Sequence, residues 1–199
     1  MANPQSVDGS RRIGKGLVIT VSGPHGTGKS TYARALAEFL RLRYVSAGEL
    51  FRELAKERGM SLESFSQYAA HNPEIDHLID ERTVEEAKKG SVVIDAQLAA
   101  WMIKDLADVR LLLTASDPVR FSRIAQRDHV SLEFAKTETL TREEIQRRRY
   151  QKYYGIDVTD FNIYDLKIDT GLHSIETTRK HVLDSVRNLL QSKEKRRST

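Results

Sequence analysis

A glycine-rich motif, GPHGTGKS at residues 23–30, narrows the possible folds of this 199-residue sequence more than any other segment. It fits the pattern G-x-x-x-x-G-K-[S/T] in full. The motif directly follows a short apolar run at residues 17–21 and directly precedes a segment whose apolar residues recur at helical spacing. A nearly continuous apolar strand is typical of a parallel sheet that is covered on both faces. We therefore expect an α/β fold with a phosphate-binding loop between its first strand and its first helix.

The residue types in this motif suit it to bind the phosphates of a nucleotide. Glycines allow backbone torsions that turn successive N–H groups toward a phosphate, and the helix that follows adds the positive end of its dipole. Lys29 can reach the β- and γ-phosphates, and the Ser30 hydroxyl can bind Mg²⁺. His25 could be interpreted as an acid–base group, but we expect it to contribute only its backbone N–H.

A second candidate ligand for Mg²⁺ is Asp95, which ends the apolar run at residues 91–95. In proteins with a phosphate-binding loop, a carboxylate at the end of a neighbouring strand holds the metal or a water bound to it. The alternative is an aspartate that caps a helix or a turn. We favour the metal role.

The rest of the sequence alternates strand and helix patterns, which predicts a doubly wound sheet. Three helical segments between residues 47 and 89 are expected to form an insertion over one edge of this sheet. Residues 128–140 lack clear periodicity and predict a loop or lid, followed by a charged helix that opens at Thr141 with capping-box spacing. The remaining expected strands are 43–46, 109–115 and 166–169, and the remaining expected helices begin at Asp117 and span 175–190.

Three arginines in the helix after Asp117 lie on one helical face and could neutralise the charge of a phosphate. Arg120 can pair with Asp117. Arg123 and Arg127 are four residues apart and repel each other unless an anion binds between them. A solvated, charged helix surface is the alternative interpretation for each of these arginines.

Two further arginines are candidates for the same role. Arg149 has Ile145 four positions earlier instead of an acidic residue, so we expect its guanidinium to be free. Arg52 follows a small turn at the end of the second expected strand, and ligands of open α/β sheets bind outside such strand ends. A guanidinium at that position could bind a second phosphate group with two parallel hydrogen bonds.

Basic residues outside these motifs gather at the two ends of the chain. The formal net charge is +4, but residues 1–16 carry +2 and residues 191–199 carry +3, which leaves the body close to neutral. A nucleic-acid-binding protein concentrates its charge on the fold, so we interpret 1–15 as a disordered tail and 191–199 as a basic tail, and expect no nucleic-acid partner. Zero cysteines exclude disulfides and thiolate metal sites. Without a signal segment or an apolar run of ~20 residues, we expect a cytoplasmic protein with no membrane partner.

Four stretches of the chain resemble the archaeal-type cytidylate kinases, short members of the nucleoside monophosphate kinase family in the P-loop NTPase superfamily. They are GPHGTGKST at 23–31, SAGELFRELAKERGMSLESF at 46–65, VVID with LAAWM shortly after it, and RRRYQKYYGIDVTDFNIYDLKIDT at 147–170. The last two are much more specific to the family than the glycine-rich motif alone. The resemblance implies a five-stranded parallel sheet in the order 2-3-1-4-5. It also implies a single kinase domain at 16–190, with a monophosphate-binding region at about 46–90 and an arginine lid at about 128–141.

The same resemblance implies a reaction, namely transfer of a phosphoryl group from ATP to CMP or dCMP with Mg²⁺, and we expect a monomer whose partners are these nucleotides. One position departs from the family, in which the strand carboxylate is commonly followed by Gly-Arg. This chain has Ala96-Gln97 there, so an amide replaces the expected arginine. The alternatives are another monophosphate kinase that accepts AMP or UMP, and a P-loop switch or nucleic-acid-associated ATPase.

These inferences give a residue-level hypothesis for the site. The expected ATP-binding residues are Gly23, Pro24, His25, Gly26, Thr27, Gly28, Lys29, Ser30 and Thr31. The expected phosphoryl-transfer residues are Lys29, Arg123, Arg127 and Arg149, the expected acceptor-binding residues are Ser46, Gly48, Arg52 and Gln97, and the expected metal ligands are Ser30 and Asp95.

Overall fold

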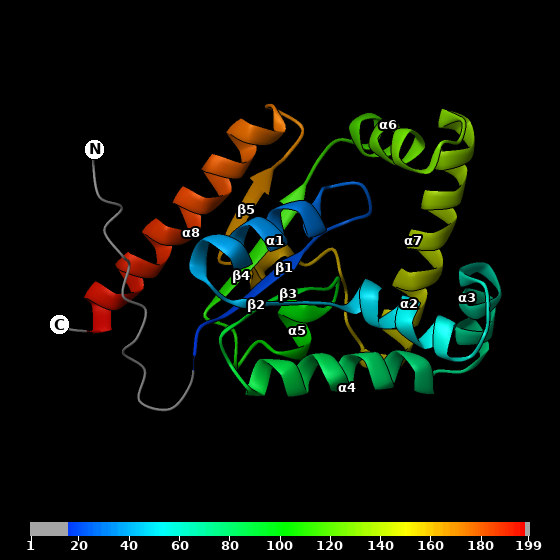
Figure 1. Ribbon diagram of the computed structural model, residues 1–199, viewed down its shortest axis with the longest axis horizontal. Coiled ribbons are helices and arrows are strands. Elements are labelled where there is room, and N and C mark those ends of the chain that lie inside the picture. The colour runs from blue at the N-terminus through cyan, green and yellow to red at the C-terminus, as the bar shows by residue number, and fades with distance from the viewer. Residues whose placement is uncertain (1–15, 198–199) are drawn as a thin grey trace.

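A computed structural model describes residues 16–197 and shows one five-stranded parallel sheet in the order β2-β3-β1-β4-β5 (Figure 1). The expected strand order is therefore confirmed. The expected disordered tail at 1–15 lies outside the described residues. The strands are β1 (Val18–Ser22), β2 (Arg43–Ser46), β3 (Val92–Asp95), β4 (Val109–Thr114) and β5 (Leu166–Asp169).

Burial and register explain why the functional motifs meet at one edge of this sheet. Every residue of β1 and β3 is buried, as the continuous apolar runs predict for central strands. In the register of the sheet, Asp95 is the partner of Val21 on one side and of Ser46 on the other. The strands β1, β2 and β3 therefore end together, and ligands of such sheets bind outside these carboxyl ends.

Helices cover both faces of the sheet, as expected for a doubly wound fold. On one face, α1 (Lys29–Leu40) and α8 (Ile175–Arg197) pack Leu36 and Val186 against Ile19 of β1. On the other face, α4 (Glu74–Lys88) and the short α5 (Ala99–Met102) pack Ala87 and Ala99 against β3. Figure 1 shows α1 and α8 on one side of the strands and α4 and α5 on the other.

The expected insertion between β2 and β3 consists of α2 (Ala47–Glu57), α3 (Leu62–His71) and α4. It has its own apolar cluster, which includes Leu54, Phe65 and Ile75 and is separate from the clusters that cover the sheet. Ser46 caps α2 because its hydroxyl accepts a hydrogen bond from the backbone N–H of Glu49. The insertion is therefore a small helical layer that begins at the ligand-binding edge.

The prediction of a loop or lid without periodicity at 128–140 is wrong in its secondary structure. After α6 (Asp117–Asp128), the helix α7 spans Leu132–Tyr154 and is nine residues longer at its start than expected. Ser131 caps α7 by accepting the N–H of Phe134. Only Ala135 and Thr139 of α7 are buried, and its leucines and phenylalanine are exposed, so the sequence carries no amphipathic period there.

Two other segments differ from expectation. Residues 191–197 of the expected basic tail continue α8, and the Lys193 ammonium donates hydrogen bonds to the Asp108 carbonyl at 2.7 Å and to Asp165 Oδ1 at 2.9 Å. These partners are distant in sequence, so the local pattern could not reveal them. Neither α5 nor the 3₁₀ turn at Phe161–Ile163 was expected, because both are too short to show periodicity. Within residues 16–197, no helix is long and apolar enough to cross a membrane.

Candidate active site

The phosphate-binding loop between β1 and α1 has the backbone that its glycines were expected to provide. Gly23, Gly26 and Gly28 have φ angles of 145°, 79° and 82°. A Cβ atom on Gly23 would lie 2.1 Å from the Leu113 carbonyl oxygen, and one on Gly26 would lie 2.6 Å from that of Arg120. The loop therefore requires glycine for both its torsions and its close packing.

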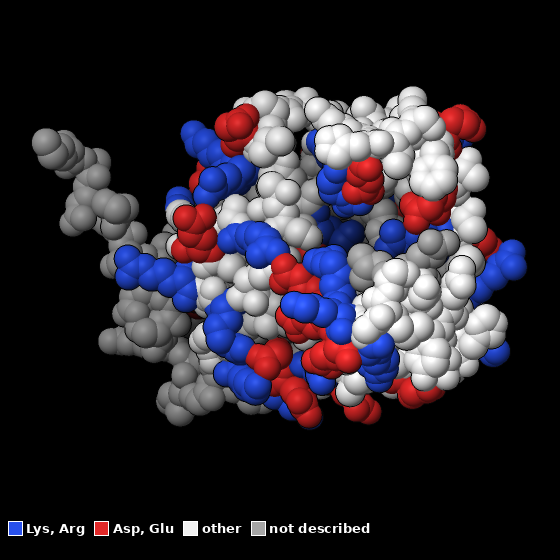
Figure 2. All heavy atoms as spheres, turned by 45° about the vertical axis from the view of Figure 1, so that its right-hand side comes forward, with Lys and Arg blue, Asp and Glu red and all other residues white. Residues whose placement is uncertain are grey.

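The side chain of the loop lysine, Lys29, is hydrogen-bonded to the backbone of its own loop. Lys29 Nζ donates to the Pro24 carbonyl at 3.0 Å, and Thr27 Oγ1 donates to the same oxygen at 2.9 Å. Burial lowers the pKa of the Lys29 ammonium, while nearby Asp95 and Glu143 act in the opposite direction. Figure 2 brings the right-hand side of Figure 1 forward and shows a hollow there with Lys and Arg atoms visible inside it. The loop thus presents a buried cation beside a basic recess.

The two expected metal ligands, Ser30 and Asp95, are brought together from positions 65 residues apart. Ser30 Oγ donates to Asp95 Oδ2 at 2.6 Å, and the Tyr44 hydroxyl donates to the same oxygen at 3.0 Å. Asp95 is 4% exposed. Among residues 16–197 there is no group of three acidic, histidine or cysteine side chains that could hold a metal. One carboxylate and one hydroxyl beside a phosphate loop fit Mg²⁺, which is usually bound by one or two carboxylates together with phosphate oxygens and water.

The contact between the loop and α7 was not anticipated. The backbone N–H of His25 donates to Glu143 Oε1 at 2.9 Å, and the His25 ring lies 3.0 Å from Gln146 Oε1. Burial first, and then nearby Lys29, lower the pKa of His25 to about 3. The imidazole is therefore neutral near pH 7 and adds no charge to the loop.

The arginines of α6 are distributed differently from the sequence hypothesis. Arg120, which was expected to form a helix-surface pair with Asp117, has a side chain only 5% exposed and also binds Glu143 and the His25 carbonyl. Arg123 donates to the Thr170 hydroxyl at 2.9 Å and to the Gly26 carbonyl at 3.4 Å.

Arg127, in contrast, pairs with the adjacent Asp128 and has a side chain 67% exposed. The structure therefore brings Arg120 and Arg123 to the loop and leaves Arg127 at the surface. A helix-face argument could not separate them, because the loop that receives their hydrogen bonds is almost a hundred residues away in sequence.

The prediction that Arg149 is free is wrong. Its Nη2 atom lies 3.2 Å from Asp76 Oδ1 of α4, and both side chains are less than one-fifth exposed. The partner comes from another helix 73 residues away, so the spacing within α7 did not reveal it. Arg149 Nε and Asp76 Oδ2 are buried without a hydrogen-bond partner in the described part of the chain. The pair thus retains unused donor and acceptor positions.

The expected acceptor residues lie at the ends of β2 and β3. Ser46 is buried at the start of α2, and a Cβ on Gly48 would lie 3.6 Å from Arg52 Nη1, so the exposed Arg52 guanidinium lies beside this turn. Gln97 lines a cavity of about 290 Å³ that opens beside Pro24 of the loop.

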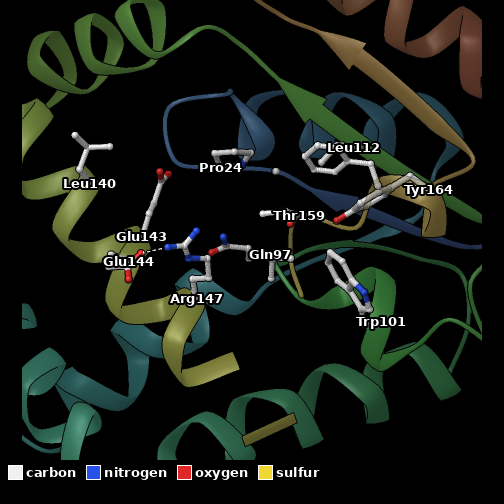
Figure 3. Close-up of a pocket in the computed structure, with 13 residues that line it drawn as sticks. Pro24, Gln97, Trp101, Leu112, Leu140, Glu143, Glu144, Arg147, Thr159 and Tyr164 are labelled. Carbon is white, nitrogen blue, oxygen red and sulfur yellow. Dashed lines mark hydrogen bonds and ion pairs between the residues drawn. The ribbon is translucent and has the colours of Figure 1, made fainter. Parts of the chain in front are cut away.

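The walls of this cavity come from four elements and the loops between them. Figure 3 shows Gln97 after β3, Arg147 from α7, and the rings of Trp101 and Tyr164 around the cavity. The two rings meet edge to face with centroids 5.5 Å apart. Sequence reasoning missed these aromatic walls, because the segment before β5 that carries Tyr164 has no strand or helix period.

Comparisons with known proteins show the family and the fold of this chain. A model of the cytidylate kinase-like family matches residues 18–172. The curated cytidylate kinase of Staphylothermus marinus is 47% identical over 175 residues, which are 88% of this chain and 99% of that protein. The curated cytidylate kinase of Aeropyrum pernix is 49% identical over 167 residues, which are 84% of this chain and 97% of that protein.

Among solved structures, shikimate kinase from Bacteroides thetaiotaomicron superposes with a TM-score of 0.62 at 15% identity, covering 88% of this chain and 98% of that chain. At this level of identity the similarity concerns the fold alone.

Proposed function

This chain belongs to the cytidylate kinase-like family, and we propose that it transfers the terminal phosphoryl group of ATP to cytidine monophosphate. The proposal is carried by the match to curated cytidylate kinases over most of both chains, because that match includes the phosphate loop and the acceptor-side segments together. We extend the proposal to dCMP as a second acceptor. We also propose that the protein acts as a cytoplasmic monomer whose partners are nucleotides.

On the donor side, the loop would bind the phosphates of ATP. Its backbone N–H groups and the start of α1 favour anions, and Lys29 needs only to leave the Pro24 carbonyl to reach the β- and γ-phosphates. Ser30 and Asp95 would hold Mg²⁺, which when bound supplies positive charge to the transferring phosphoryl group. Transfer itself requires little covalent chemistry from the protein, so positioning and charge account for most of the catalysis.

On the acceptor side, Arg52 would bind the monophosphate, and Gln97 would donate a neutral hydrogen bond from its amide. Arg123 lies against the loop, which supports a role near the transferring group. Arg149 is paired with Asp76 at the α4–α7 contact, so its proposed role rests on the family resemblance. Arg127 is a weaker candidate because it is paired at the surface. Because α7 lies against the loop through Glu143, its movement would admit nucleotides and its return would exclude water.

The experiment that tests this function measures phosphate transfer from ATP to CMP, dCMP, UMP, AMP and GMP. We expect CMP and dCMP to give the highest kcat/KM. Preferential transfer to AMP or UMP would show that the acceptor site, with an amide at Gln97, is specific for a different base and that the protein is another nucleoside monophosphate kinase. ATP hydrolysis that is stimulated by RNA or DNA, without transfer to any monophosphate, would contradict the proposal and favour a nucleic-acid-associated ATPase.

A further inference from the structure

One carboxylate of α7 binds where the phosphate loop offers its donors. Glu143 Oε1 accepts the backbone N–H of His25 at 2.9 Å and Arg120 Nη1 at 2.7 Å. Its second oxygen lies 3.2 Å from Arg120 Nη2. The carboxylate is therefore held by a loop N–H group and by both arms of a buried guanidinium.

These donors are the kind that such loops use for phosphates, namely backbone N–H groups and cationic side chains around a glycine-rich turn. Burial lowers the pKa of the Lys29 ammonium, and Glu143 lies close enough to act against this shift. Lys29 itself donates to the loop carbonyl of Pro24. Two of the loop's anion-binding groups, the His25 N–H and the Lys29 ammonium, are thus satisfied by atoms of the same chain.

We propose that Glu143 is an internal anion that occupies part of the phosphate-binding loop and competes with the triphosphate of ATP. The inference rests on the proposed function for the identity of this nucleotide. A carboxylate oxygen and a phosphate oxygen cannot both accept the single His25 N–H at 2.9 Å, and the Arg120 guanidinium is already shared among Glu143, Asp117 and the His25 carbonyl. ATP must therefore displace Glu143, and the apparent affinity for ATP is reduced by the fraction of molecules in which Glu143 is bound.

Displacement of Glu143 also breaks a link between the loop and α7. Gln146, one turn later, holds the His25 ring, and Arg149 near the end of α7 is bound to Asp76 of the insertion. The loop and the insertion thus hold the same helix at two places. A triphosphate that removes the first attachment would let α7 move, so ATP binding and lid movement would be coupled through one side chain.

The direct test is the equilibrium binding of ATP, measured by calorimetry, to the wild type and to Glu143→Gln. The amide is nearly isosteric and can still accept the His25 N–H, but it removes the competing charge. We expect the ATP Kd to fall about tenfold, which corresponds to about 1.4 kcal/mol. Inorganic tripolyphosphate should gain by a similar factor, because the competition concerns phosphate and not the base.

Glu138→Gln is the matched control. Glu138 lies on the same helix, pairs with Arg142 at 3.5 Å and is 42% exposed, so its substitution makes the same change in charge away from the loop. We expect its ATP Kd to equal that of the wild type. An equal fall in Kd for both variants would overturn the proposal, because it would show a general effect of charge. An unchanged or higher Kd for Glu143→Gln would overturn it too, since Glu143 would then only support the loop.

Glu143→Gln pairs less well with the buried Arg120, and this variant could fail to fold for that reason. Glu143→Asp then provides a second measurement. Aspartate keeps the charge and shortens the reach, so we expect the ATP Kd to fall about threefold. An ATP Kd no lower than that of the wild type would overturn the proposal. Failure of the proposed function is distinguishable, because it would appear as ATP binding without transfer to CMP, while the binding comparison would keep its meaning.

Discussion

In the proposed acceptor site, the neutral Gln97 would leave most of the acceptor's charge for Arg52 to balance. A nucleoside monophosphate carries close to two negative charges, and a site with two arginines would bind it through paired, charge-assisted hydrogen bonds. Gln97 lines the cavity beside the loop but supplies no charge. Arg52 lies beside the Gly48 turn at the same edge of the sheet. At the scale of single residues, Arg52 should therefore carry most of the acceptor-phosphate binding.

We expect Arg52→Ala to weaken acceptor binding by roughly 2–4 kcal/mol, the range for loss of one partner of a charge-assisted contact, provided that the site closes over the bound acceptor as proposed. The KM of ATP should change little because the loop is a separate subsite. Gln97→Arg should lower the KM of the acceptor or leave it unchanged. The measurement is the KM and kcat of the acceptor at saturating ATP, with Arg58→Ala at the end of α2 as the control. Wild-type acceptor kinetics in Arg52→Ala would show that the monophosphate binds elsewhere.

The residues that sequence analysis placed correctly beside one another share a local cause. The loop glycines and Lys29 are neighbours in one motif, and Ser30 and Asp95 meet because strand ends of a parallel sheet coincide. Arg120 and Glu143 were not assigned to the loop, because their hydrogen bonds join α6, α7 and the loop across long separations. Spacing along one helix carries no information about such contacts.

At the scale of elements, the strands and the helices of the insertion were easier to predict from the sequence than α7 was. The buried central strands and the helical insertion follow from apolar patterns that tertiary packing reinforces, whereas the sheet order was expected from the family resemblance. The helix α7 contacts α6 through Glu143 and α4 through Arg149, and the residues it buries are the small Ala135 and Thr139, so its contacts leave no apolar period in the sequence. Its start at Leu132 depends on the Ser131 cap, and its end depends on Gly155 in a left-handed conformation.

The contact between α4 and α7 should make stability depend on pH. The Tyr154 hydroxyl donates to Asp80 Oδ2 at 2.6 Å, and Asp76, His77 and Arg149 surround the same carboxyl. Burial is the largest influence and raises the pKa of Asp80 from 3.8 to about 6. Between these two pH values the folded protein keeps a proton that the unfolded chain has lost. The contribution of Asp80 to the free energy of unfolding therefore falls as pH rises through this window, and the loss is complete above it.

We expect Asp80→Asn to remove this loss, because the amide oxygen can still accept the Tyr154 hydroxyl. Relative to the wild type, the variant should be equally stable near pH 4 and more stable by about 1–3 kcal/mol at pH 8. The measurement is the free energy of unfolding by urea at several pH values. Asp128→Asn is the control of opposite sign, because the hydrogen bond from Arg127 lowers the pKa of Asp128. A difference between Asp80→Asn and the wild type that does not grow with pH would contradict the argument.

At the scale of the whole molecule, the two edges of the sheet serve different purposes. The carboxyl ends of the strands carry the phosphate loop and Asp95. The opposite edge is held by Asp165, which binds Arg110 at 3.0 Å and Lys193 at 2.9 Å. Lys193 thereby attaches the last turns of α8 to the starts of β4 and β5. Substitutions at the amino ends of the strands should consequently change stability, and substitutions at their carboxyl ends should change catalysis.

A pair of lysine substitutions tests this separation. Lys193→Met should lower the free energy of unfolding by about 1–2 kcal/mol through the loss of its two hydrogen bonds. It should leave kcat/KM within about threefold of the wild type, because distant sites act independently. Lys29→Ala should do the reverse: kcat should fall on the order of a hundredfold or more, since charge stabilisation supplies most of the catalysis.

Burial lowers the pKa of Lys29, so the folded protein holds this charge at a cost that alanine removes. The free energy of unfolding of Lys29→Ala should therefore equal or exceed that of the wild type, as expected where an active site sacrifices stability for function. Urea unfolding and steady-state transfer to CMP, measured on both variants, check the two halves of the prediction. If Lys193→Met slowed transfer as much as Lys29→Ala, the two edges of the sheet would be coupled. If Lys29→Ala were less stable than the wild type, the loop lysine would be a structural residue, and its burial would have to be explained by packing.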